Sequence, residues 1–191
     1  MSSNSVKVHP EYKHFASIPW CAKILATFDS PSHLVYVSQN RTVLPTRENQ
    51  YVGGTLNTPD TITAWLFLHP LPQAPDWKVG ELCSLITFNH GMIGFPGTAH
   101  GGGIALVMDE VTGLHIVAQR PEGSEPKKNF VTGYLNISFY KPVPAPGTVL
   151  VRSWIVKVEG RKHYVAAQME DEHGEVLAKA EVLYISIRNK L

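Results

Sequence analysis

The segment that follows His100 has the pattern of a helix with no polar side. At 100° of rotation per residue, one side is an apolar stripe with a single histidine: Ile104, Val107, Met108, Val111, His115 and Ala118. The other side holds Asp109 among apolar and small residues: Leu106, Gly113, Ile116 and Val117. A helix that is apolar all round is buried all round. One side is therefore expected to face a sheet, with His115 as a core histidine, and the other to meet a second subunit or further protein.

Strand-like runs flank this helix on both sides. Two precede it, at 61–68 and 82–88, and four follow it, at 129–140, 148–160, 163–172 and 175–187. The short turns between the later runs favour antiparallel hairpins, because parallel neighbours need long crossover connections. One helix cannot cover both faces of a sheet. The pattern therefore predicts an α+β fold in which one antiparallel sheet wraps around a long central helix.

The length of 191 residues suits a single domain with a small addition. We expect residues 60–191 to form that domain. Residues 1–59 are expected to be an N-terminal extension of short helices, strands and turns, to which no chemistry is assigned.

Composition excludes several classes of partner and site. With 17 basic and 16 acidic residues, the net charge of +1 gives no reason to expect a nucleic acid or a membrane surface as partner. Cys21 and Cys83 are the only cysteines and do not form a C-x-x-C pair, which excludes a disulfide framework and a cysteine-rich metal site. The first residues lack the basic-then-apolar layout of a secretory signal, so we expect a cytoplasmic protein. The ending Asn189-Lys190-Leu191 is one residue from the peroxisomal Ser-Lys-Leu address, which is the alternative location.

The predicted helix begins with backbone donors and continues into a carboxylate pair. Glycines at 101–103 leave the N–H groups of the first turn open, and one of them could polarise a carbonyl oxygen. Two turns further on, Asp109 could attack that carbon or activate a water that does. Burying a carboxylate is costly unless it is paired, so Asp109 and its neighbour Glu110 indicate chemistry more than stability. The alternative is a glycine-rich helix start followed by a solvent-facing Asp-Glu pair.

Other uses of a glycine-rich turn do not fit the surrounding residues. The HGGG oxyanion loop of lipases needs a G-x-S-x-G elbow, which this chain lacks. A dinucleotide fingerprint needs a third glycine where Leu106 stands, and a phosphate loop needs Gly-Lys-Ser/Thr. These enzyme classes are excluded.

The chain resembles the hotdog-fold acyl-CoA thioesterases, specifically the PaaI-like branch of the 4-hydroxybenzoyl-CoA thioesterase superfamily. The resemblance lies in His100-Gly101-Gly102, the apolar helix with Asp109 nine residues after the histidine, and the stretch LNISFYKPVP at 135–144. It covers roughly residues 60–188, while residues 1–59 are similar to the added region of fungal thioesterase-like proteins. Many bacterial members have an asparagine six residues before the histidine, where this chain has Gly94.

The resemblance implies a role for four residues in catalysis. Asp109 would be the nucleophile or the general base, and the Gly101 N–H would polarise the thioester carbonyl. His100 would line or orient the site. Thr132 stands where some members have a serine or threonine, on the strand crossing from the partner subunit, that positions the water.

Four further residues are candidates to bind substrate: Gly102, Gly103, Glu110 and Lys141. Glu110 either competes with Asp109 or is a hydrogen-bonded structural residue. Lys141 either meets the phosphates of coenzyme A or belongs to a solvated rim.

The implied function is hydrolysis of an acyl thioester, foremost acyl-CoA, in a homodimer or homotetramer whose site lies at the subunit interface. No metal or cofactor is implied. Two alternatives remain open: a hotdog protein that acts on another acyl intermediate by hydration or dehydration, and a non-catalytic acyl-CoA binding module.

Overall fold

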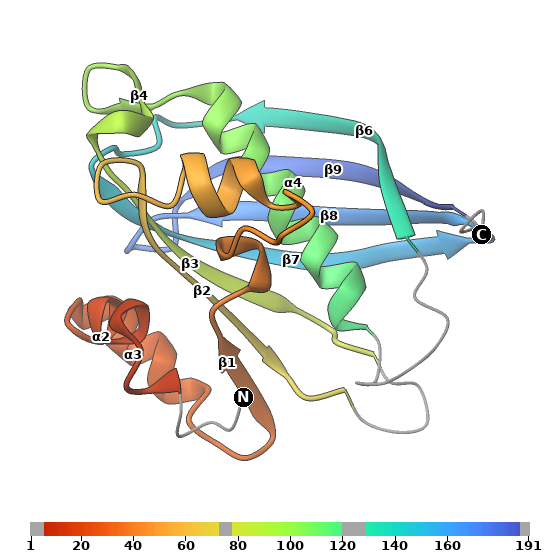
Figure 1. Ribbon diagram of the computed structural model, residues 1–191, viewed down its shortest axis with the longest axis horizontal. Coiled ribbons are helices and arrows are strands. Elements are labelled where there is room, and N and C mark those ends of the chain that lie inside the picture. The colour runs from red at the N-terminus through yellow and green to blue at the C-terminus, as the bar shows by residue number, and fades with distance from the viewer. Residues whose placement is uncertain (1–5, 73–77, 120–128, 188–191) are drawn as a thin grey trace.

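The computed structural model describes residues 6–72, 78–119 and 129–187. A seven-stranded antiparallel sheet curves around helix α4 (Gly101–Ala118), as Figure 1 shows. Across the sheet the strands follow the order β1 (His33–Tyr36), β2 (Ile62–Pro70), β3 (Leu82–Phe88), β7 (Gly147–Glu159), β8 (Lys162–Glu170), β9 (Val176–Ile187) and β6 (Asn129–Phe139). The predicted fold class, an antiparallel sheet around one long helix in the hotdog arrangement, is confirmed.

The connection through α4 determines this topology. Strand β3 is followed by a 3-10 turn (His90–Met92), a small hairpin of β4 (Ile93–Phe95) with β5 (Thr98–Ala99), and then α4. The chain next enters β6, which pairs with β9 at the far edge of the sheet, while β3 pairs with β7. Helix α4 therefore crosses the inner face of the sheet between its two halves.

Helix α4 buries the side predicted to face the sheet. Its buried residues are Ile104, Val107, Met108, Val111, Thr112, His115 and Ile116. The second side is only partly buried in the single chain, contrary to the expectation of burial all round. Ile116 on that side is 3% exposed, but Val117 is 59% exposed and Leu106 is half-buried. By length and composition alone α4 could cross a membrane, but here it is the core helix of the sheet.

Helices α2 (Pro10–Ala16) and α3 (Pro19–Thr27) cover the outer face of β2 and β3. Along β2, Trp65 and Phe67 join the core around α4, whereas Leu66 and Leu68 join the core under α2 and α3. A strand that is buried on both faces has a nearly continuous apolar sequence, which explains the run in β2. The extension is thus joined to the rest of the chain in two ways. Its strand β1 belongs to the same sheet, and its helices α2 and α3 share a second core with β2 and β3.

Both cysteines lie in this outer core. Cys21 and Cys83 are buried, and burial raises the pKa of both thiols to about 12. A thiol with so high a pKa is protonated and a poor nucleophile at neutral pH. The two residues are therefore core residues.

The second half of the extension differs from the predicted strands and turns. Only β1 is a strand, and it is followed by the 3-10 turn η1 (Gln39–Arg41) and the π-helical turn η2 (Gln50–Thr55). The two turns pack closely, since a Cβ at Gly53 would lie 2.8 Å from the carbonyl oxygen of Asn40. This close approach of backbones needs a glycine, and it is a tertiary contact that no local pattern predicts.

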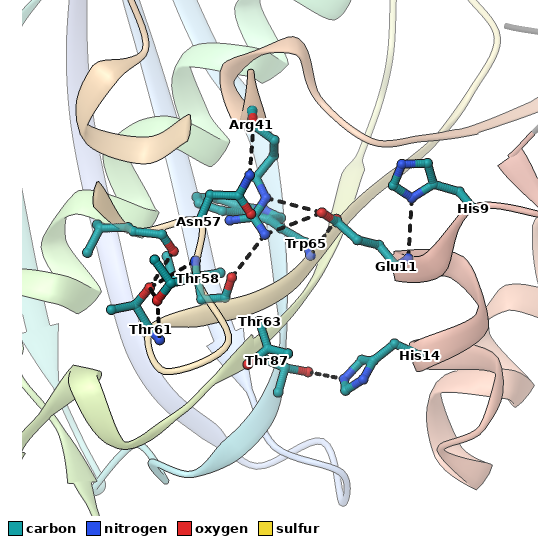
Figure 2. A network of polar contacts seen from close by, with 12 residues as sticks. His9, Glu11, His14, Arg41, Asn57, Thr58, Thr61, Thr63, Trp65 and Thr87 are labelled. Atoms are coloured by element: carbon teal, nitrogen blue, oxygen red, sulfur yellow. Dashed lines mark hydrogen bonds and ion pairs between the residues drawn. The ribbon is translucent and has the colours of Figure 1, made fainter. Parts of the chain in front are cut away.

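A buried ion pair holds the extension to β2 (Figure 2). The Arg41 guanidinium lies 3.3 Å from Glu11 Oε1, and the two side chains are only 2% and 12% exposed. Glu11 Oε2 accepts the backbone N–H of Trp65 at 2.9 Å, and Arg41 Nη2 donates to the Ile62 carbonyl at 2.9 Å. One charge pair therefore connects α2, η1 and β2.

We expect Glu11→Ala to lower the free energy of unfolding by about 3 kcal/mol, because it leaves the Arg41 charge buried without its partner. The matched control is Asp29→Ala, which breaks the exposed Lys7–Asp29 pair and should cost less than about 1 kcal/mol. Urea unfolding of both variants measures the difference. Equal losses would show that the buried pair does not hold the extension.

Candidate active site

The first turn of α4 presents one backbone donor to the surface. His100 is the N-cap, and its Nδ1 accepts the N–H of Gly102 at 3.0 Å. Gly101 is the first helical residue, and its N–H has no acceptor within the helix. Gly101 and Gly102 are both exposed, so of these two only the Gly101 N–H is available to a bound carbonyl oxygen.

The close packing around His100 explains two other glycines. A Cβ at Gly94 would lie 2.7 Å from His100 Cα, so no asparagine side chain fits at this position. A Cβ at Gly103 would lie 2.7 Å from the Met92 methyl group. Gly103 thus faces the flexible end of Met92, which can move, whereas Gly94 faces the backbone of His100.

A groove of about 400 Å³ opens beside Gly101. Its walls come from β4, β5, the start of α4 and the end of β6, and it is lined by Phe95, Thr98, Ala99, Gly101, Ile104, Phe139, Tyr140, Lys141, Pro142 and Val143. Phe95, Phe139 and Tyr140 are exposed, and Lys141 pairs with Glu175 at 2.5 Å with both side chains about half exposed. The groove therefore combines apolar walls with a cation at its rim.

The Asp109 carboxylate is held from two strands. Its Oδ1 accepts the hydroxyl of Thr132 on β6 at 2.9 Å and that of Tyr184 on β9 at 2.9 Å. Within the described part of the chain, Oδ2 accepts no hydrogen bond. Thr132, which the resemblance places on a strand from the partner subunit, contacts the carboxylate of its own chain.

Glu110 lies on the other flank of α4 and contacts the extension. Its Oε2 accepts Asn40 Nδ2 at 2.7 Å, and burial raises the pKa of its carboxyl, with the neighbouring Asp109 charge acting in the same direction. The two carboxylates are thus separated, Asp109 toward β6 and β9 and Glu110 toward η1. Sequence reasoning assigned no chemistry to the extension and missed Asn40.

The contacts of Tyr184 and Thr112 with Asp109 were also not predicted from the sequence. Tyr184 lies near the end of β9, and Thr112 lies on the buried side of α4. One signal was present, since antiparallel pairing of the last strand with the strand after the helix brings Thr132 opposite Tyr184. That signal depends on a register that the sequence alone does not fix.

The separation between Gly101 and Asp109 limits what one chain can do. The residues are eight positions apart on α4, which is about 12 Å along the helix axis. An oxyanion donor must lie about 3 Å from the oxygen, and an attacking atom about 3–3.5 Å from the carbon. The two groups of one helix therefore cannot act on the same carbonyl, which corrects the expectation that a carboxylate two turns on serves the donor of its own helix.

His115 is the core histidine that the sequence predicts. It is fully buried, its Nδ1 lies 2.9 Å from Ser153 Oγ and its Nε2 lies 3.1 Å from the Val79 carbonyl, and burial lowers its pKa. In the parts of the chain that the structure describes, no three His, Cys, Asp or Glu side chains gather as a metal site.

Part of this chain is similar in sequence to known thioesterases. Residues 96–178 match the family model described as thioesterase superfamily. Acyl-coenzyme A thioesterase THEM4 of Mus musculus is 35% identical over 95 residues, which are 49% of this chain and 38% of the mouse protein. The match thus spans well under half of that relative's length.

Solved structures with low identity share the fold. A phenylacetic acid degradation-related protein of Ralstonia eutropha is 22% identical, covers 75% of this chain and 92% of its own, and has a TM-score of 0.52. A thioesterase protein of Streptococcus pneumoniae, solved with coenzyme A, is 16% identical, covers 56% of this chain and 79% of its own, and has a TM-score of 0.50. Both support the hotdog architecture.

We expect the stability difference between the native chain and Glu110→Gln to depend on pH. The folded pKa of Glu110 is raised above its ordinary value of 4.5. The stability that the neutral carboxyl gives the folded chain is therefore complete below pH 4.5 and is lost as the pH rises through the folded pKa. The glutamine keeps an acceptor for Asn40 and does not titrate. Urea unfolding at about pH 4 and about pH 8 should show the native chain losing stability relative to the variant at the higher pH. A constant difference would contradict the raised pKa.

Proposed function

We propose that this chain, whose residues 96–178 belong to the thioesterase superfamily, is a hydrolase that cleaves acyl thioesters, with acyl-CoA as substrate. The observation that carries the proposal is the Asp109 carboxylate, which is held at one oxygen on a helix that starts with an open glycine N–H. The name of the mouse relative, acyl-coenzyme A thioesterase, and the coenzyme A of the Streptococcus pneumoniae structure support the substrate class.

The groove beside Gly101 is the proposed entrance for the thioester. The Gly101 N–H, at the positive end of the helix, donates to the carbonyl oxygen as negative charge builds on it. The apolar side chains of Phe95 and Phe139 flank the thioester. Lys141, at the rim, is placed to meet a phosphate of coenzyme A in exchange for Glu175.

Asp109 supplies the attack on the thioester carbon. Its Oδ2 either adds to the carbon directly or removes a proton from a water that adds. In both cases a tetrahedral intermediate forms, its oxyanion is held by Gly101, and collapse breaks the carbon–sulfur bond and releases the thiolate. Direct attack leaves the acyl group on Asp109 as an anhydride, which a water then hydrolyses, whereas attack by water gives the acid at once and the proton taken up by Asp109 passes to the thiolate. The free acid is the second product.

A homodimer through β6 gives a geometry in which both groups reach one carbonyl. Strand β6 is an edge strand of eleven residues, and Val131, Tyr134 and Phe139 on it are exposed. An exposed edge of this length is a template for pairing with another strand. Two-fold antiparallel pairing of β6 with its copy lays the two α4 helices antiparallel, so that Asp109 of one chain approaches the glycine turn of the other.

The test compares Asp109→Asn with Glu110→Gln. We measure thiol release from acetyl-, hexanoyl- and palmitoyl-CoA, and we expect Asp109→Asn to lose at least about 100-fold in kcat because the attacking oxygen is gone. The matched control Glu110→Gln should stay within about tenfold, since its carboxyl lies on the other flank of α4 and keeps its contact with Asn40.

The pattern of loss decides between the alternatives. Collapse of Glu110→Gln with an active Asp109→Asn would transfer the role to Glu110. Coenzyme A binding by the native chain without turnover of any of the three thioesters would favour a non-catalytic binding module.

A further inference from the structure

The Asp109 side chain is oriented by a residue outside the thioesterase motif of this chain. Tyr184, near the end of β9, is 5% exposed, and its hydroxyl lies 2.9 Å from Asp109 Oδ1 and 2.5 Å from the Asp109 backbone carbonyl. One hydroxyl therefore bridges the backbone and the carboxylate of the same residue. Such a contact fixes the side-chain rotamer of Asp109 relative to the helix.

The Tyr184 hydroxyl is itself held in place. Thr112 Oγ1 lies 3.0 Å from it and 2.7 Å from the Met108 carbonyl, and Thr112 is fully buried. Gly113 leaves the space that the phenol needs, because a Cβ there would lie 3.3 Å from the Tyr184 hydroxyl. The arrangement thus combines a buried donor, a buried partner that orients it, and a glycine that makes room.

Strand register brings a second donor to the same oxygen. Thr132 on β6 pairs directly with Tyr184 on β9, so their side chains lie side by side on the inner face of the sheet. Both hydroxyls reach Oδ1 at 2.9 Å. Burial and the Asp109 charge raise the pKa of the Tyr184 phenol, which therefore stays protonated and remains a donor.

We propose that Tyr184 is a positioning residue: together with Thr132 it occupies Asp109 Oδ1 and turns Oδ2 toward the thioester. This inference rests on the proposed function and extends it to a residue beyond the segment that matches the superfamily, since that segment ends at residue 178. The two donors divide the carboxylate into a held oxygen and a reacting oxygen. A freely rotating carboxylate would present Oδ2 for only part of the time.

The experiment removes the hydroxyl and keeps the ring. With hexanoyl-CoA as substrate, Tyr184→Phe should lower kcat by about 10- to 100-fold and change KM by less than about twofold, because misplacing a reacting group slows chemistry without weakening binding. The matched control is Tyr36→Phe, which alters a tyrosine in β1, the edge strand opposite β6, that stacks on Phe67, and it should leave kcat unchanged. Urea unfolding and far-UV circular dichroism of each variant show whether the fold is kept.

A second variant covers the case in which Tyr184→Phe does not fold. Gly113→Ala keeps the phenol but shifts its hydroxyl by a few tenths of an ångström from its place beside Asp109, so kcat should fall by a smaller factor with KM unchanged. Full activity of folded Tyr184→Phe, or of Gly113→Ala where the first variant is unfolded, would overturn the role of Tyr184 and leave the proposed function intact. A native chain without thioesterase activity would overturn both.

Discussion

The rise of helix α4 is the constraint on which the proposed site depends. The helix carries an open N–H at Gly101 and a held carboxylate at Asp109, eight residues apart or about 12 Å along its axis. No side-chain rotation brings two groups so far apart onto one carbonyl carbon and its oxygen. A chain that uses both in one reaction must therefore take one of them from a second copy, and the exposed edge strand β6 is the part of the fold that can supply it.

The two edges of the sheet differ in length, because β6 has eleven residues and β1 has four. At the edge opposite β6, β1 pairs with β2, and helices α2 and α3 cover the outer face of β2 and β3. The Arg41–Glu11 pair fixes η1, which places Asn40 against Glu110 on one flank of α4. The other flank of α4, which carries Asp109, faces β6 and β9. There Asp109 contacts Thr132 of β6 and Tyr184 of β9. The adjacent carboxylates are therefore separated by their neighbours: one is held by the extension and the other is turned toward the proposed interface.

How much of this could be predicted depends on how local each feature is. The apolar periodicity of α4 and the strand runs around it depend on near neighbours in sequence, and they predicted an antiparallel sheet around one long helix and the buried His115. Asn40 with Glu110 and Tyr184 with Asp109 are contacts between residues at least 70 positions apart. Such contacts depend on sheet register and on the path of the extension, which no periodicity encodes. The π-helical turn at Gln50–Thr55 was missed for the same reason, because its close approach to η1 is tertiary.

The most direct test mixes two inactive chains, Asp109→Asn and Gly101→Pro. Proline removes the N–H at a first helical position that suits it: His100 before it has φ −63° and ψ 132°, and a Cβ at Gly101 meets only Phe139 at 3.5 Å. A site shared between subunits predicts that each variant alone is inactive and that the mixture recovers about a quarter of the native rate per chain, because half of the dimers are mixed and each has one intact site. No recovery in mixed dimers that demonstrably form would contradict a site built from the Asp109 of one chain and the Gly101 of the other.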